Sequence, residues 1–405
     1  MRPVKLDMMN AKKLSLTTIL AAGLVLPALA DDKKPAKKEA KPKIEVCFVL
    51  DTTGSMGGLI AGAKEKIWGM ANEIISAKPV PEVRIGLIGY RDKTDAYVTK
   101  IHPLSNDIDD IYAKLMAFKA QGGGDTPESV NQALNEAVTK MKWSADKKVL
   151  KVIFLVGDAP PHMDYKQDIK YPTSCELAVK KDLIINTIQC GNMAATTPIW
   201  QEIAHKAEGK FARILQDGGV MAIATPFDKQ IAACNVKLGN TVCVYGDART
   251  QRFAASKVTL AESAPAVASA DRAEFLSKAK RDGYAFDEVI TGGGDLVDLL
   301  ANKKIKVEEI EEKKLPDKVR KMKPKEREAY FAKQIADRKK LQTELTGLLK
   351  KRSEFVIAKK AELKKKGKGD GFDEQVNGFI RQQAAKKGFR YEEPAKKPEK
   401  KEPKK

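Results

Sequence analysis

Five oxygen-bearing side chains in three short segments could together hold a hard metal ion. "DTTGS" follows an apolar run, "GGGDTPE" precedes an expected helix, and "LVGDAPPH" follows the most apolar run of the chain. The candidate ligands in these segments are Asp51, Thr53, Ser55, Thr126 and Asp158. Two carboxylates and three hydroxyls without His or Cys suit Mg²⁺ best, with Mn²⁺ or Ca²⁺ as alternatives, and they suit zinc or copper poorly.

Two carboxylates and neutral hydroxyls would leave such an ion incompletely neutralised. A near-octahedral Mg²⁺ would keep waters, and one position could accept a carboxylate from a partner. Each segment also has an ordinary structural interpretation. The hydroxyls of Thr53 and Ser55 could cap a helix, Asp125 or Thr126 could begin the next one, and Asp158 could be a turn residue.

Strand-like and helical patterns alternate along residues 44–250. Strands are predicted at 44–50, 82–90, 96–101, 148–158, 183–189 and 210–214. Helices are predicted at 59–77, 108–118, 128–141, 199–207 and 219–236, the last with an interruption near Pro226. This alternation predicts an α/β fold with a mainly parallel sheet covered on both faces. Ligands of such sheets bind at the carboxyl ends of the strands, where the strand order reverses. Asp51 and Asp158 end two apolar runs, so we expect them at the same edge of the sheet.

With these segments in their order, residues 44–240 resemble a von Willebrand factor type A (VWA) domain of the exported bacterial type. The five candidate ligands match the metal-ion-dependent adhesion site of that family, with the Asp-x-Ser-x-Ser loop at Asp51 to Ser55, the second loop at Thr126 and the third at Asp158. Thr53 departs from the family's serine but keeps the hydroxyl oxygen. The resemblance implies a Rossmann-like, doubly wound, mainly parallel sheet. It also implies adhesion-type binding, in which the ion bridges to an acidic residue of a partner protein.

Catalysis has less support than binding. A cation with an open position could activate water, but the histidines that could act as bases are only three: His102, His162 and His205. His162 lies near the candidate site, but an ordinary loop histidine is a better interpretation of it than a catalytic base. "GGGDTPE" lacks the Lys-Ser/Thr of a phosphate-binding loop. We therefore expect no enzyme, with a metal-assisted hydrolase as the weakest alternative. Asp164 and Tyr165 could help to contact a partner.

Residues 1–30 have the pattern of a secretory signal peptide. Basic residues precede an apolar run from Leu14 to Leu26, and Ala28-Leu29-Ala30 supplies the small residues of a cleavage site. An uncleaved anchor is the alternative. We expect an exported protein, periplasmic or secreted.

The chain has five cysteines, and none of their spacings matches a zinc site. Export permits disulfides, but an odd number leaves at least one thiol unpaired. Cys47 lies in a strand pattern, where a buried thiol behaves as a small hydrophobe. Cys234 and Cys243 are close in sequence and could pair.

The net charge of +20 is unevenly distributed. Residues 44–250 carry no net charge, whereas residues 301–405 contain 34 Lys and Arg against 18 Asp and Glu. We predict a disordered basic tether at 31–43, a linker with short helices at 241–322, a basic helical region at 323–391 and a disordered Lys/Pro/Glu tail at 392–405. Apolar residues recur at helical spacing in the basic helical region but are interrupted by Arg338 and Arg352. This favours a hairpin or weak coiled coil.

Basic helices suggest polyanionic partners, here an anionic envelope polymer or lipid headgroups. Export argues against nucleic acid, and the tail also lacks the interleaved aromatic and basic residues that contact bases. The interleaved acids also fit a solvated helix with ion pairs four residues apart. The alternative function is therefore an envelope-attached structural protein that acts through its tail. Chelation separates the two hypotheses, because only the adhesion module loses its partner without metal.

Overall fold

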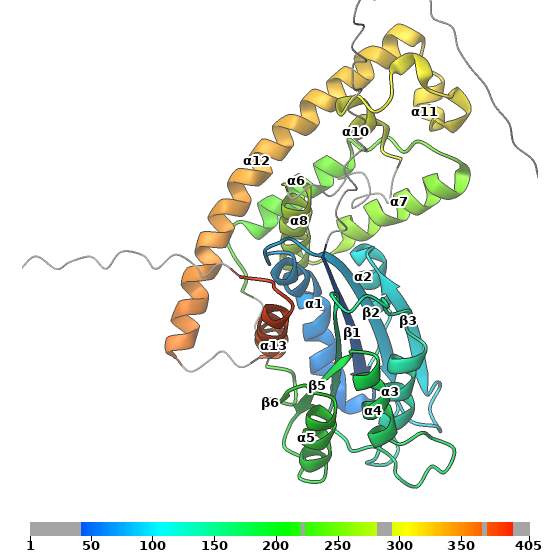
Figure 1. Cartoon of the computed structure of the whole chain (residues 1–405). Coiled ribbons are helices and arrows are strands. Elements are labelled where there is room, and N and C mark those ends of the chain that lie inside the picture. Colours follow the sequence, from blue (N-terminus) through cyan, green and yellow to red (C-terminus); the bar gives the residue numbers. More distant parts are fainter. Residues whose placement is uncertain (1–41, 220–222, 282–293, 367–370, 392–405) are drawn as a thin grey trace, which may run out of the picture. The chain divides into compact units, whose positions relative to one another are not determined.

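A computed structural model describes residues 42–219, 223–281, 294–366 and 371–391 (Figure 1). The expected signal peptide, the tether up to residue 41 and the tail at 392–405 lie outside the described residues. The strands are β1 (Lys43–Asp51), β2 (Glu82–Tyr90), β3 (Thr99–Ser105), β4 (Leu150–Gly157), β5 (Ile184–Cys190) and β6 (Phe211–Ile214).

The longer helices of the first half are α1 (Gly57–Ile74), α2 (Ile108–Met116), α3 (Val130–Thr139), α4 (Tyr171–Lys180) and α5 (Thr196–Lys206). Those of the second half are α6 (Asp228–Gly239), α7 (Ala248–Ser263), α8 (Ala266–Arg281), α10 (Leu296–Ala301), α11 (Asp317–Arg320), α12 (Pro324–Lys365) and α13 (Phe372–Lys386).

The six strands form one sheet in the order β3-β2-β1-β4-β5-β6. Only β3 is antiparallel to its neighbour, and the remaining pairs are parallel. The chain winds outward from β1 to β3 and then returns to the other side of β1 with β4, so the strand order reverses between β1 and β4. The predicted α/β fold class is confirmed, and the two strands that end at Asp51 and Gly157 flank the reversal point.

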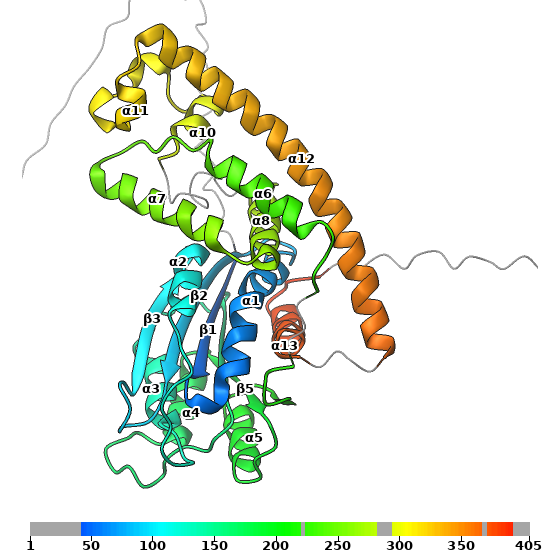
Figure 2. The same ribbon diagram turned by 180° about the vertical axis from the view of Figure 1, so that it is seen from behind.

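Both faces of the sheet are covered by helices (Figures 1 and 2). Alternate residues of a strand point to opposite faces. Val46 and Phe48 accordingly enter the core under α1, α2, α8 and α13, and Cys47 and Val49 enter the core under α3, α4 and α5. Burial on both faces explains why β1 and β4 are continuously apolar rather than alternating.

Three elements differ from the sequence prediction. The strand predicted at 96–101 lies at Thr99–Ser105, and α4 was not predicted. Of the helical segment predicted at 219–236 with an interruption near Pro226, the part after the proline forms α6 from Asp228, whereas residues 223–225 are not helical. The Asp228 carboxylate accepts hydrogen bonds from the backbone N and the hydroxyl of Thr225, which stabilises the start of the helix there.

The second half of the chain is mainly helical, as predicted. Residues 241–322, expected to hold short helices, include α7 and α8 with 16 residues each. Helix α12 is one helix of 42 residues that contacts α6, α8 and α10. Arg338 and Arg352, which interrupt its apolar stripe, are buried because they pair with buried aspartates of other helices.

All five cysteines are free and buried, so the suggested pairing of Cys234 with Cys243 is wrong. The two residues belong to different hydrophobic clusters, and the Cys234 thiol donates to the backbone oxygen of Leu341 instead. Within the ranges that the structure describes, no helix combines the length and apolar character needed to cross a membrane.

Candidate functional site

Asp51, the last residue of β1, has a fully buried side chain. Its Oδ1 accepts hydrogen bonds from the backbone N (2.8 Å) and the hydroxyl (2.6 Å) of Thr53. Its Oδ2 is buried and has no hydrogen-bond partner among the described residues. Burial raises the pKa of Asp51 to about 7. The negative charge of Asp158 acts in the same direction, and the bonds from Thr53 oppose it.

The hydroxyls after Asp51 do not act as helix caps. Thr53 is the residue before the 3₁₀ turn Gly54–Met56, and its side chain accepts no capping hydrogen bond. Met56 is the residue before helix α1, and its side chain accepts none either. Thr53 Oγ1 instead donates to Asp51 and lies 3.4 Å from Ser55 Oγ. The Thr53 hydroxyl is therefore bonded to the carboxylate and the Ser55 hydroxyl lies beside that of Thr53, which is not what the capping interpretation expects.

Asp158 lies beside Asp51 because β1 and β4 pair in parallel and both end here. Its side chain is largely buried, and its Oδ2 accepts a hydrogen bond of 2.7 Å from Gln216. Gly157 makes the close approach of the two strand ends possible. A Cβ on Gly157 would lie 2.9 Å from Asp51 Cβ and 3.1 Å from Asp51 Oδ2.

The loop that carries Thr126 lies against the loop after β1. Gly54 N donates to Gly122 O at 3.1 Å. Gly122 has φ +82°, and a Cβ there would lie 2.0 Å from Asp95 Oδ1, so both the backbone conformation and the space require glycine. Thr126 is exposed on this loop. The structure thus brings together the three segments with the predicted ligands, with Asp51 and Asp158 buried and Ser55 and Thr126 exposed.

Glu128 is a further carboxylate at this edge that the sequence analysis did not single out. Its side chain is buried, and Oε2 has no hydrogen-bond partner among the described residues. Burial, reinforced by the charges of Asp51, Asp92, Asp95 and Asp158, raises its pKa to about 9. Its place at the end of "GGGDTPE" was the available signal. The edge therefore gathers more carboxyl groups than it can hold ionised without a cation, which favours the binding of one.

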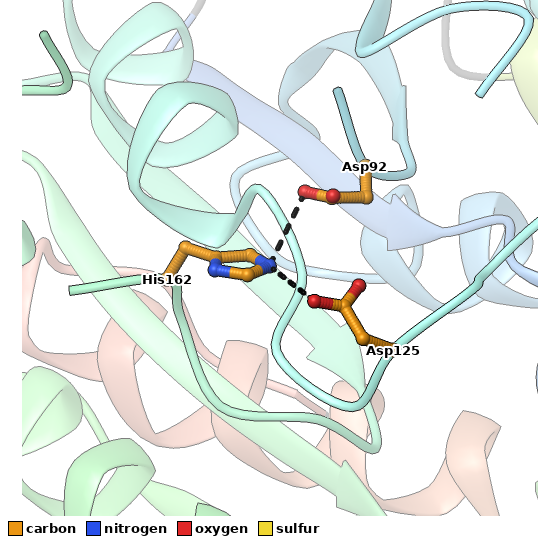
Figure 3. Close-up of side chains that lie close together, drawn as sticks. All are labelled: Asp92, Asp125 and His162. Atoms are coloured by element: carbon orange, nitrogen blue, oxygen red, sulfur yellow. Dashed lines mark ion pairs between the residues drawn. The ribbon is translucent and has the colours of Figure 1, made fainter. Parts of the chain in front are cut away.

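A second group of side chains lies at the same edge (Figure 3). His162 Nε2 is 3.6 Å from Asp92 Oδ1 and 3.6 Å from Asp125 Oδ2. His162 and Asp92 are buried, and Asp125 is exposed. The sequence analysis noted His162 but neither aspartate as its neighbour, although Asp92 follows β2 by two residues in the same way as the other ligands follow their strands.

Residues 45–225 match the family model described as von Willebrand factor A domain. Among curated proteins, von Willebrand factor A domain-containing protein 7 of Mus musculus is 31% identical over 160 residues, which cover 39% of this chain and 16% of that protein. A putative ariadne-like RING finger protein of Acanthamoeba polyphaga mimivirus is 27% identical over 166 residues, which cover 40% of this chain and 16% of that protein. The chain thus spans about a sixth of the length of these relatives.

Two solved structures are similar to part of the chain. The SpRpn10 VWA domain is 15% identical with a TM-score of 0.34, over 43% of this chain and 89% of that chain. Proximal thread matrix protein 1 from the mussel byssus, in a structure titled as having a zinc-occupied MIDAS motif, is 16% identical with a TM-score of 0.35, over 44% of this chain and 43% of that chain. On the family match and the sheet topology, the chain contains a von Willebrand factor A domain at residues 45–225.

Proposed function

We propose that this protein is an exported binding module that holds a divalent cation, Mg²⁺ in the first place, and bridges it to an acidic group on a partner protein. Asp51, Thr53, Ser55, Thr126 and Asp158 are the proposed ligands. The function is adhesion without a chemical step. Matches to von Willebrand factor A domains, which generally mediate protein interactions, support the class of function.

The observation that carries the proposal is the unpartnered Oδ2 of Asp51. A buried polar atom without a partner costs free energy, and a buried carboxylate costs more unless it is paired or binds a metal. The other oxygen of this carboxylate accepts from the Thr53 hydroxyl, which lies 3.4 Å from that of Ser55. The charge of Asp158 also acts on Asp51, at the edge where α/β sheets bind ligands. A cation would satisfy this oxygen and offset the repulsion between Asp51 and Asp158.

The exposed ligands favour bridging over a closed structural site. Ser55 and Thr126 face solvent, and all five ligands together bring only two negative charges. A divalent ion at this site retains an accessible position that water or a partner's carboxylate can take. The exposed position of the hydroxyls therefore supports binding of a partner through the ion. The unpartnered oxygen of Asp51 supports binding of the ion itself.

Gly157→Ala is expected to weaken Mn²⁺ binding by about tenfold or more while every ligand is kept. The added methyl would lie 2.4 Å from Tyr90 Oη and 3.1 Å from Asp51 Oδ2, and overpacking of this kind costs about 1–3 kcal/mol. Calorimetric titration of the full chain measures the effect. Gly347→Ala in α12, where a Cβ meets nothing within 4 Å, is the control. Equal affinities for the two variants would contradict this geometry.

The adhesion proposal is tested by passing envelope and extracellular proteins over the immobilised full chain, with Mg²⁺ and again with EDTA. Ser55→Ala removes an exposed ligand, and Ser256→Ala changes an exposed serine of α7 as the matched control. We expect a partner that the wild type and Ser256→Ala retain only with Mg²⁺ and that Ser55→Ala does not retain. Replacing acidic residues of that partner by amides should abolish its retention.

Retention that is indifferent to EDTA and to Ser55 would overturn the metal bridge. The alternative function, an envelope-attached structural protein that binds through its basic helical region, would then explain the retention better. In that case, binding to anionic vesicles or envelope polymers should be salt-dependent.

A further inference from the structure

We propose a second metal site, formed by His162, Asp92 and Asp125, that takes a borderline divalent ion such as Zn²⁺. It shares no ligand with the proposed Mg²⁺ site. The three residues come from three different loops at the sheet edge, and their ligand atoms converge on one point (Figure 3). The proposal does not depend on the adhesion function.

The distances favour a metal over direct contacts. His162 Nε2 lies 3.6 Å from an oxygen of each aspartate, which is too long for a hydrogen bond. Tetrahedral ligands at about 2.0–2.2 Å from Zn²⁺ are about 3.3–3.6 Å from one another, because the edge of a tetrahedron is about 1.6 times the bond length. The two distances from the imidazole nitrogen are thus those of a coordination shell, and the three ligand atoms all lie within 4.8 Å of one another.

The second observation is the state of His162 Nε2 itself. The side chain is 5% exposed, and Nε2 is buried without a hydrogen-bond partner among the described residues. A buried imidazole nitrogen normally finds a partner. This nitrogen points at two carboxylates that do not reach it, and an ion between them would supply the missing contact (Figure 3).

The surroundings hold His162 in the orientation of a ligand. Its Nδ1 lies 2.8 Å from Asp164 Oδ1, which can accept a hydrogen bond from this nitrogen, so Nε2 is the ring nitrogen left to bind an ion. Carboxylates in this role orient most metal-binding histidines. The Tyr165 ring stacks on the imidazole with centroids 3.9 Å apart. Asp164 and Tyr165 therefore position the imidazole and are not themselves ligands.

Asp92 is held in the same way. Ser129 Oγ donates to its Oδ1 at 2.9 Å, and Tyr165 Oη donates to its Oδ2 at 2.6 Å. Asp125 is the exposed third ligand, with a side chain 61% exposed, and leaves a fourth position open to water. One imidazole and two carboxylates neutralise a divalent ion and suit Zn²⁺ better than Mg²⁺.

The test is a calorimetric titration of the metal-free full chain with Zn²⁺, with Mg²⁺ in large excess. We expect one Zn²⁺ per chain in the wild type. His162→Gln should lose it, whereas His205→Gln, an exposed histidine of α5, should keep it. Asp164→Asn should weaken it by about 10–100-fold, the usual loss for an orienting partner. Asp51→Asn should keep it, so failure of the proposed Mg²⁺ site would leave this result interpretable.

Asp125→Asn guards against misfolding of the His162 variant, since the side chain is exposed, and should also lose the zinc. Co²⁺ in place of Zn²⁺ should give the visible bands of a tetrahedral site without the intense near-ultraviolet band of thiolates, because all cysteines are buried elsewhere. The proposal is wrong if the wild type takes up no Zn²⁺, or if His162→Gln and His205→Gln bind it equally.

Discussion

Replacing Asp51 with asparagine is expected to abolish the stabilisation of the chain by Mg²⁺ and to leave the metal-free protein at least as stable as the wild type at pH 8. Asparagine keeps an oxygen that can accept both hydrogen bonds from Thr53, and it removes the buried charge. A substitution at the end of a core strand that does not destabilise would be unusual, since most mutations do. The expected result therefore distinguishes a ligand from a structural carboxylate.

The sign follows from the pKa of Asp51, which burial raises from 3.8 to about 7 in the folded chain. Between these values the folded protein holds a proton that the unfolded chain has lost, so stability falls as pH rises from about 4 to about 7. The full shift corresponds to about 4 kcal/mol. The stability of the asparagine variant does not depend on pH through this residue. A cation bound to Asp51 removes this fall of stability with rising pH from the wild type.

Urea unfolding at pH 4.5 and at pH 8, in each case with EDTA and with Mg²⁺, gives the free energy of unfolding of each protein under four conditions. We expect Asp51→Asn to gain stability relative to the metal-free wild type as the pH rises, and Mg²⁺ to stabilise only the wild type. A wild type that ignores Mg²⁺, or an asparagine variant that is at least 1 kcal/mol less stable than the metal-free wild type at pH 8, would contradict the role given to Asp51.

The sheet was predictable because its strands are strong local signals. Burial on both faces makes residues 46–50 of β1 and 152–156 of β4 continuously apolar, and an aspartate stands at the end of β1 and directly after β4. Helix α4 was missed although its four buried residues recur at helical spacing, because one of them, Ser174, is polar. Arg338 and Arg352 looked like interruptions of an apolar stripe, since their partners, Asp295 and Asp228, lie 43 and 124 residues away.

The candidate site was predictable in part for the same reason. Asp51 and Asp158 follow buried strands, and parallel pairing alone brings them to one edge. Burial of Glu128 and His162 depends on contacts between loops: Glu128 N donates to Pro160 O, and Tyr165 covers His162. Such contacts leave no periodic trace in the sequence, so neither the raised pKa of Glu128 nor the His162 cluster could be anticipated.

Arg272→Met is expected to destabilise the chain by about 3–5 kcal/mol, the usual cost of leaving one partner of a buried ion pair uncompensated. Arg272 of α8 and Asp109 of α2 are 5% and 2% exposed and form a two-bond pair, with distances of 2.7 and 2.8 Å. Methionine fills much of the same volume but leaves the charge of Asp109 buried alone. Asp109→Leu should destabilise the chain by a similar amount, because it leaves the buried guanidinium of Arg272 without its partner.

The double variant Asp109→Leu/Arg272→Met should recover to within about 1 kcal/mol of the wild type, since well-packed apolar residues often replace a buried pair without loss. Lys206→Met, which breaks an exposed pair with Glu202 in α5, is the control and should cost less than about 1 kcal/mol. Denaturant unfolding of the four variants measures these differences. A double variant less stable than either single one would mean that the helices need the pair for more than compensation of charge. Full recovery would mean that α8 is held on the VWA domain mainly by its apolar contacts with α1, including Phe275 against Trp68.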